Sequence, residues 1–114
     1  PVVVTVYSPE CGPCRRQAPL FAEIHKEYGK HVQFIGVGML DTKEGTRGFL
    51  DEFGITYPSV YDPSAERDIL RSFGFTMQPA TLFIGYDGEE ISRFEGEIDA
   101  DQLERSTRTL LPSA

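Results

Sequence analysis

Apolar residues recur along the chain at two spacings, which predict strands and helices in alternation. Residues 2–7 read Val-Val-Val-Thr-Val-Tyr and are nearly all apolar, as in a strand that is buried on both faces. Residues 14–28 instead predict a helix that carries its apolar side chains on one side, namely Leu20, Phe21, Ile24 and Tyr28. Pro19 is expected to bend this helix, and Gly29 is expected to end it.

The middle of the chain repeats this alternation. Asp62-Pro63-Ser64 is a signal for the start of a helix, and Gly54 and Gly74 are typical helix ends. The predicted elements are, in order, a strand over residues 32–37, a loop over 38–42, a helix over 43–53, a short extended piece over 58–61 and a helix over 65–73.

The last third of the chain predicts a hairpin followed by a helix. Residues 80–86 and 90–95 form strands joined by a two-residue turn at Asp87-Gly88, and the last helix follows residue 98 and runs to about residue 111. The early strand-helix-strand crossover implies a parallel pair, whereas the hairpin adds antiparallel strands. We therefore predict an α/β fold, a single domain over residues 1–114 with a central mixed sheet flanked by helices.

The composition excludes some classes of partner. The net charge of −7 argues against nucleic acid, which binds basic surfaces. The sequence contains no run of about 18 apolar residues, so we expect no segment of it to cross a membrane. It starts directly on the residues of the first predicted strand, and we expect any further N-terminal strand, export signal or anchor to lie outside it.

The only two cysteines form the sequence Cys11-Gly12-Pro13-Cys14, between the first strand and the first helix, which is typical of a redox pair. Cys11 is expected to attack as the thiolate, because the positive end of the helix dipole stabilises its charge. Cys14 is expected to be more buried and to resolve the mixed disulfide. The alternative is a pair that is inert or binds metal, but a zinc site needs four ligands. Only His25 and His31, otherwise expected at the surface, remain to join it.

Several features together resemble the thioredoxin superfamily over nearly the whole chain. They are the Cys-Gly-Pro-Cys sequence after a buried strand, Pro19 five residues past the second cysteine, Pro79-Ala80-Thr81 before a late strand, the Asp87-Gly88 hairpin, and Gly96 before the last helix. The segment over residues 38–61, which contains Phe53-Gly54-Ile55-Thr56-Tyr57-Pro58, is similar to the insertion of the TlpA-like group. That group comprises extracytoplasmic thiol-disulfide oxidoreductases and includes the cytochrome c maturation proteins.

The resemblance implies a thioredoxin fold with an inserted helix and strand, and a dithiol that reduces protein disulfides without metal or any other cofactor. Gly12-Pro13 goes with the reducing members of the superfamily. Pro79 resembles the family's cis-proline, which would place the backbone of Gln78 opposite Cys11 to pair with an extended substrate. An ordinary trans turn at Pro79 is the alternative.

The sequence departs from the family at three positions. Glu10 stands where a tryptophan usually precedes the first cysteine, and it would disfavour the Cys11 thiolate unless it points into solvent. Thr5 and Gln17 stand where relatives carry a carboxylate that accepts the proton of the second cysteine. Neither side chain is a base near neutral pH. We therefore expect water or the substrate to take that proton, and exchange below neutral pH to be slower than in relatives that carry the acid.

Five further residues near the cysteines have two interpretations each. Arg15 and Arg16 either stabilise the thiolate and steer acidic partners, or form an ordinary solvated helix face. Tyr7, Phe75 and Met77 either line an apolar docking surface around Cys11 or pack in the core.

Two other functions occur on this fold. A peroxiredoxin-type peroxidase needs a Thr-x-x-Cys context, which the spacing of Thr5 and Cys11 does not supply. A non-enzymatic binding module or metallochaperone is the other, and the copper-carrying relatives of this kind use C-x-x-x-C with a distal histidine, a spacing one residue longer than here. We therefore predict a monomeric, extracytoplasmic bacterial thiol-disulfide oxidoreductase, with cytochrome c maturation as a candidate role. Its partners would be protein disulfides and an upstream thiol donor. A cytoplasmic location is the alternative, because a C-x-x-C pair fits any compartment.

Overall fold

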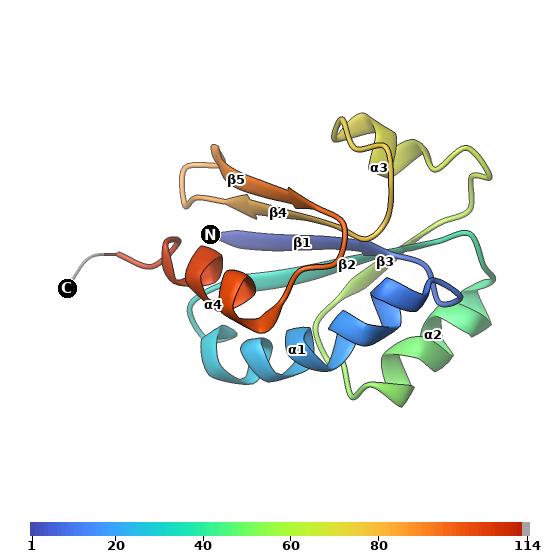
Figure 1. Ribbon diagram of the computed structural model, residues 1–114, viewed down its shortest axis with the longest axis horizontal. Coiled ribbons are helices and arrows are strands. Elements are labelled where there is room, and N and C mark those ends of the chain that lie inside the picture. The colour runs from blue at the N-terminus through green and yellow to red at the C-terminus, as the bar shows by residue number, and fades with distance from the viewer. Residues whose placement is uncertain (113–114) are drawn as a thin grey trace.

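A five-stranded sheet in the order β3-β2-β1-β4-β5 forms the middle layer of the computed structural model (Figure 1). The structure describes residues 1–112. None of the helices in this range combines the length and the apolar composition that crossing a membrane requires. The elements in chain order are β1 (Val2–Tyr7), α1 (Gly12–Tyr28), β2 (Gln33–Met39), α2 (Lys43–Glu52), β3 (Ser59–Asp62), α3 (Asp68–Ser72), β4 (Ala80–Ile84), β5 (Glu90–Glu95) and α4 (Ala100–Arg108).

β1 is the central strand of the sheet. It runs parallel to β2 and antiparallel to β4, so that Thr5 lies between Gly36 and Thr81. β3 pairs in parallel with β2 at one edge, and β5 pairs antiparallel with β4 at the other. The mixed sheet that the crossover and the hairpin predict is therefore confirmed, and the extended piece before Asp62 is one of its strands.

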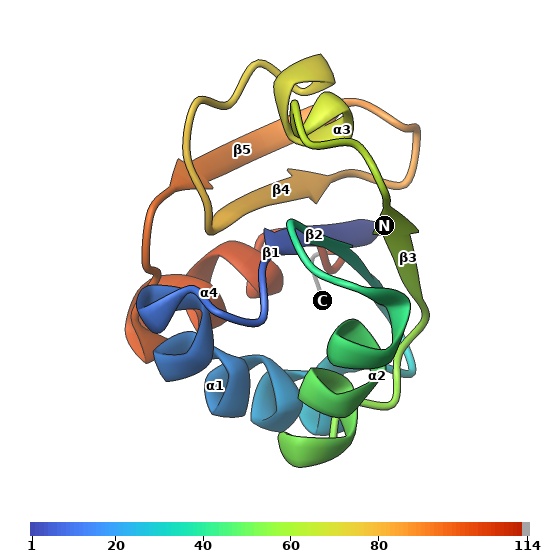
Figure 2. The ribbon, with the colours of Figure 1, turned by 90° about the vertical axis from the view of Figure 1, so that its right-hand side faces the viewer.

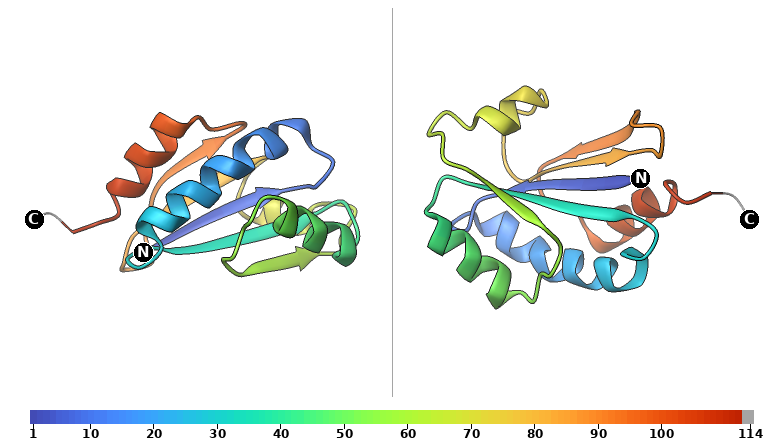
Figure 3. Two further views of the ribbon diagram at one scale, coloured as in Figure 1. Left: turned by 90° about the horizontal axis from the view of Figure 1, so that it is seen from below. Right: turned by 180° about the vertical axis from the view of Figure 1, so that it is seen from behind.

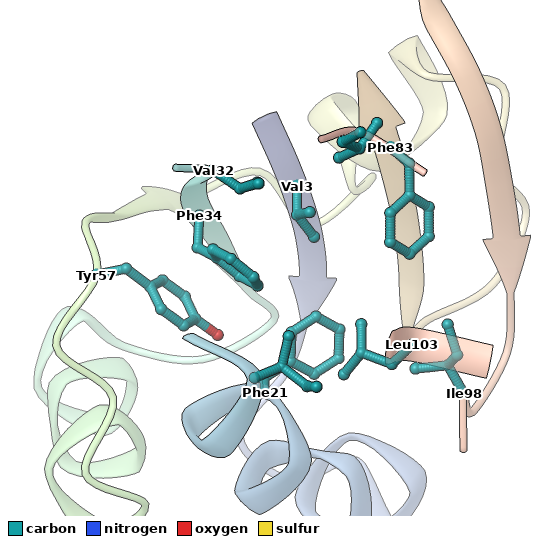
Figure 4. Close-up of a cluster of buried hydrophobic side chains, with 10 residues drawn as sticks. Val3, Phe21, Val32, Phe34, Tyr57, Phe83, Ile98 and Leu103 are labelled. Atoms are coloured by element: carbon teal, nitrogen blue, oxygen red, sulfur yellow. The ribbon is translucent and has the colours of Figure 1, made fainter. Parts of the chain in front are cut away.

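The helices cover the two faces of the sheet unequally. α4, α1 and α2 lie across one face, and α3 lies on the other (Figures 1, 2 and 3). Successive side chains of β1 point to opposite faces. Val3 accordingly packs with Phe21 of α1 and Leu103 of α4 in the larger core (Figure 4), whereas Val6 packs with Leu70 of α3 in the other.

The third helix is shorter than predicted. It covers Asp68–Ser72 rather than residues 65–73, because Arg67 has φ of 57°, a left-handed conformation that cannot continue a right-handed helix. The start signal at Asp62 nevertheless has a structural counterpart. The Asp62 carboxylate accepts the backbone N–H of Ser64 at 2.9 Å and that of Ile69 at 3.0 Å, and so ties the loop to the first turn of α3.

Other boundaries also differ from the prediction. β2 continues to Met39 because β3 pairs with it as far as Asp62. The hairpin turn is wider than two residues, since β4 ends at Ile84 and the Gly85 N–H donates to the Glu89 carbonyl oxygen at 2.8 Å. Gly88 in this turn has φ of 85°, a conformation that favours glycine. The last helix ends at Arg108.

Candidate active site

Cys11 and Cys14 lie at the start of α1 and are joined in a disulfide, with their Cα atoms 5.2 Å apart. Cys11 is the N-cap residue of the helix, and its Sγ accepts the backbone N–H of Cys14 at 3.2 Å. Cys11 is partly exposed, whereas Cys14 is only 1% exposed and packs against Tyr7, Ala18 and Phe49. A reaction partner in solution therefore reaches the Cys11 sulfur first.

The residues next to the two cysteines are arranged as a solvent-facing turn. Gly12 is exposed and Pro13 is partly exposed in the first turn of α1, where a proline's missing N–H costs no helix hydrogen bond. Glu10 is exposed, which agrees with the alternative that its carboxylate points into solvent. Its effect on the Cys11 sulfur is accordingly screened by water.

Gln78 and Pro79 lie beside the end of β1 that leads to Cys11, because Val6 pairs with Ala80. The Gln78–Pro79 peptide bond is cis. Pro79 is buried, and its carbonyl oxygen accepts the Gly96 N–H at 2.7 Å. The turn that the resemblance assigns to substrate pairing therefore lies beside the strand that leads to the cysteines.

Arg67 holds the side chain of Gln78 and is a site residue that sequence reasoning missed. Its Nη1 donates to Gln78 Oε1 at 2.8 Å. Arg67 is eleven positions before Gln78 in the chain, and its place depends on the left-handed backbone that ends the predicted helix early. No sequence motif marks it.

The two arginines that follow the second cysteine form ion pairs. Arg15 pairs with Glu52 of α2 and also donates to the Pro9 carbonyl oxygen at 3.1 Å. Its guanidinium lies 5.1 Å from the centre of the Phe53 ring, so Arg15 joins α1 to α2. Arg16 pairs with Glu97 at 2.9 Å on the surface. The charge of each arginine is therefore paired with a glutamate carboxylate and not with a cysteine sulfur.

Core packing is the correct interpretation for Tyr7 and Phe75, which are both buried, whereas Met77 is 49% exposed. The Tyr7 ring stacks on Phe49 of α2 at 4.7 Å, and its hydroxyl shares a hydrogen bond of 2.8 Å with Ser59 of β3. The predicted insertion therefore contributes packing directly beneath the cysteine pair.

The expectation that both histidines are surface residues is wrong for His25. His31 is exposed, but His25 is only partly exposed and meets the rings of Phe34 and Tyr57 edge-on, at 5.4 and 5.2 Å. Within residues 1–112, no three side chains of His, Cys, Asp or Glu gather as a metal site would require.

A small cavity lies behind Cys14, between β1 and α1. The polar residues that line it are Thr5, Tyr7, Gln17 and Tyr57, and its volume is about 10 Å³. Gln17 is 2% exposed, and its Oε1 accepts the Ile98 N–H at 3.1 Å. The two positions where relatives carry a carboxylate thus both line this cavity, and hydroxyl and amide groups stand there.

Burial raises the pKa of the Tyr57 phenol, and the neighbouring Tyr7 raises it further. Burial also raises the pKa of Tyr7, against the opposite effect of its hydrogen bond with Ser59. Both phenols therefore stay neutral near pH 7 and remain able to donate and to accept hydrogen bonds. Sequence reasoning missed Tyr57, since an aromatic residue after a helix is an ordinary core position.

Comparison with known proteins places these observations in a family. Residues 1–111 match the model of the family described as Redoxin. The thiol-disulfide oxidoreductase ResA of Bacillus thuringiensis is 26% identical over 103 residues, which are 90% of this chain and 58% of the relative. The chain therefore spans less than three fifths of the length of that curated relative.

Solved structures show the same fold. A secreted disulfide oxidoreductase of Mycobacterium tuberculosis, described as homologous to Escherichia coli DsbE, matches with a TM-score of 0.85 at 20% identity, over 96% of this chain and 81% of that one. A DsbF homologue from Corynebacterium diphtheriae matches with a TM-score of 0.83 at 26% identity, over 96% and 71%. The thioredoxin fold expected from the sequence is confirmed, and the ResA relative agrees with the TlpA-like resemblance.

Proposed function

Because the chain belongs to the Redoxin family, we propose that it is a thiol-disulfide oxidoreductase that reduces disulfide bonds in proteins. The observation that carries this proposal is the unequal exposure of two bonded cysteines at the start of α1. The partly exposed Cys11 can meet a disulfide of another protein. The buried Cys14 can react only with a sulfur that Cys11 already holds.

The proposed reaction has two displacements. The Cys11 thiolate attacks one sulfur of the substrate disulfide, a bond forms between them, and the other substrate sulfur leaves as a thiolate that takes up a proton. Cys14 then attacks the Cys11 sulfur, so that the Cys11–Cys14 disulfide forms and the second substrate sulfur leaves. Two electrons pass from the chain to the substrate, and an upstream thiol donor restores the dithiol.

The substrate is proposed to bind as an extended segment against the backbone of Gln78. The Gln78–Pro79 turn lies beside the end of β1 and next to the exposed Met77, which offers an apolar contact. Backbone pairing of this kind gives affinity with little dependence on sequence. This suits an enzyme that acts on disulfides in more than one sequence context.

We propose that the chain acts as a monomer outside the cytoplasm and that cytochrome c maturation is among its candidate roles. Two observations support the location: the likeness to ResA and the likeness to a protein described as secreted. Fractionation of cells that produce the whole protein tests this, because the proposed location predicts the protein in the extracytoplasmic fraction. Recovery with the cytoplasmic enzymes would contradict the location and leave the redox proposal standing.

Reduction of insulin by dithiothreitol is the direct test of activity. The wild type should accelerate precipitation of the insulin B chain above the rate with dithiothreitol alone, and Cys11→Ser should abolish this acceleration. Consumption of hydrogen peroxide by the same samples is the control for a peroxidase. A wild type that does not accelerate insulin reduction would refute the proposal.

The order of the two thiols is tested by trapping. Cys14→Ser should accumulate mixed disulfides with protein substrates, since no second thiol remains to release them. Cys11→Ser should not accumulate them, because Cys14 is buried. Equal trapping by the two variants would contradict the assignment of Cys11 as the nucleophile.

A further inference from the structure

The cavity behind Cys14 is lined by hydroxyl groups and contains no carboxylate. Thr5, Tyr7 and Tyr57 line it together with Cys14 and Gln17. The volume open to a water molecule is about 10 Å³, which is about the room that one buried water needs. A buried water also needs two or more polar partners, and these side chains supply them.

Tyr57 is one of the hydroxyl-bearing residues that line this cavity. It is 5% exposed, and its hydroxyl makes no hydrogen bond with another residue in the range 1–112. Figure 4 shows its ring directed inward from the segment before β3, with the hydroxyl toward Phe21 of α1. Because Tyr57 lines a space that admits a water molecule, a water there can form a hydrogen bond with its hydroxyl.

The Tyr7 hydroxyl connects this cavity to the edge of the sheet. It shares its hydrogen bond with Ser59, in which either oxygen can be the donor, and Ser59 is only partly buried in β3. The close approach requires Gly36 and Gly38 in the intervening β2. A Cβ atom at Gly36 would lie 2.9 Å from Ser59 Oγ, and one at Gly38 would lie 3.1 Å from the Tyr7 hydroxyl oxygen.

We propose that a water molecule in this cavity, positioned by the Tyr57 hydroxyl, takes the proton of the Cys14 thiol and passes it through Tyr7 and Ser59 to solvent. This inference rests on the proposed oxidoreductase function, in which Cys14 resolves a mixed disulfide. The water and the hydroxyls of Tyr7 and Ser59 would together do what a carboxylate at the position of Thr5 or Gln17 does in relatives.

The proton and electron balance of this step is complete. The S–H bond of Cys14 breaks, its electron pair forms the bond to Cys11 Sγ, and the bond from Cys11 to the substrate sulfur breaks. The substrate sulfur leaves with that electron pair. The proton moves to the water, and each hydroxyl of Tyr7 and Ser59 accepts one proton as it donates another, so both end neutral. Tyr57 acts as a positioning residue, because it holds the water and exchanges no proton with the sulfur.

The reaction of the reduced protein with 5,5′-dithiobis(2-nitrobenzoate) separates the two steps. Attack by Cys11 releases one coloured thiolate, and resolution by Cys14 releases the second. We expect Tyr57→Phe and Ser59→Ala each to slow the second release about tenfold, less than the hundredfold or more that loss of the acid or base itself typically costs, because the water remains as the proton acceptor. The first release should be unchanged in both. Ser59→Thr keeps the hydroxyl and should keep the wild-type rate.

Tyr61→Phe is the matched control, because the Tyr61 hydroxyl donates to the Asp41 carbonyl oxygen and not to the cavity. An unchanged second release in Tyr57→Phe or in Ser59→Ala would overturn the proposal, as would equal slowing of both releases. If Tyr57→Phe does not fold, Ser59→Ala against Ser59→Thr decides alone. The reagent is a small disulfide and does not depend on protein docking. A wild type that releases both coloured thiolates from it but does not reduce insulin would refute the proposed function and would leave the relay testable.

Discussion

The two faces of β1 differ in what they contribute: the face toward α3 contributes only to a core, whereas the face toward α1 contributes to the larger core through Val3 and also to the cavity behind Cys14. Toward α3, Val4 and Val6 pack in an apolar core with Leu70. Toward α1, Thr5 and Tyr7 line a cavity against Cys14. The difference begins in the sequence, since the residues toward α3 are all valines, whereas two of those toward α1 carry hydroxyl groups. Substitutions on the α3 face should therefore change stability, and substitutions of Thr5 and Tyr7 on the α1 face should change the rate of thiol exchange.

Leu70→Ala should have the largest effect on stability. Leu70 is fully buried in the α3 core, and truncation of such a side chain lowers the free energy of unfolding by about 2–5 kcal/mol. Both releases in the reaction with 5,5′-dithiobis(2-nitrobenzoate) should keep their rates at a temperature where the variant is folded. Urea unfolding measures the first quantity, and Val60→Ala on the exposed edge strand is the control. Slower release by folded Leu70→Ala would show that the faces are coupled.

Asp62→Asn should have the next largest effect, and the effect should depend on pH. Burial acts to raise the pKa of Asp62, but the hydrogen bonds from Ile69 and Ser64 outweigh it and lower the pKa overall. A lowered pKa in the folded state stabilises the fold above the unfolded pKa of 3.8, and this stabilisation is lost as the pH falls through the folded value.

The free energy of unfolding of Asp62→Asn should accordingly be lower than that of the wild type by about 1–3 kcal/mol at pH 7, through weakened hydrogen bonds to a buried charge. The difference should shrink as the pH falls below about 4. Urea titrations at pH 7, 5, 4 and 3 measure it. A difference that stays constant down to pH 3 would mean that the charge of Asp62 contributes nothing.

The sequence predicts the fold well because its strongest signals are local. The apolar run over residues 2–7, the helical pattern after Cys14 and the Asp87-Gly88 hairpin each correspond to an element of the structure. α3 is the exception. Its predicted length fails because Arg67 adopts a left-handed backbone, which a helical pattern does not encode.

The candidate site is predicted only in part. The C-x-x-C spacing identifies Cys11 and Cys14, and the resemblance identifies Gln78 and Pro79. The support beneath them depends on long-range contacts. The Tyr7 hydroxyl forms a hydrogen bond with Ser59, which is 52 positions further along the chain and on the other side of β2. Gln17 accepts a hydrogen bond from Ile98, which is 81 positions further along the chain. Such pairings become visible only once the strand order and register are known.

Gln17→Glu should strengthen the chemistry on the α1 face. The carboxylate can still accept the Ile98 N–H, and it adds an acid to the lining of the cavity behind Cys14. Burial would raise the pKa of that carboxyl toward neutrality, where it accepts a thiol proton effectively. We expect the second release to become about tenfold faster, which corresponds to about 1.4 kcal/mol in the barrier.

A double variant that combines Gln17→Glu with Ser59→Ala makes this test more specific. If the new carboxylate takes the proton of Cys14, the exit through Tyr7 and Ser59 is no longer needed, and Ser59→Ala should slow the Gln17→Glu protein less than it slows the wild type. Equal slowing in both backgrounds would mean that the carboxylate does not serve Cys14. An unchanged rate in Gln17→Glu alone would mean that its oxygens stay committed to Ile98.

Glu10→Gln should have the smallest effect, although Glu10 is the acid nearest to the cysteines in sequence. A carboxylate beside Cys11 disfavours its thiolate, but Glu10 is exposed, and water and salt screen charges at the surface. Removing the charge should therefore speed the first release by less than about twofold, with no change in the second. The gain should fade between 10 mM and 1 M salt, as the Debye length falls from about 30 to about 3 Å. A marked loss in the second release would instead identify Glu10 as the base that serves Cys14 and would place the proton on the exposed side of the disulfide.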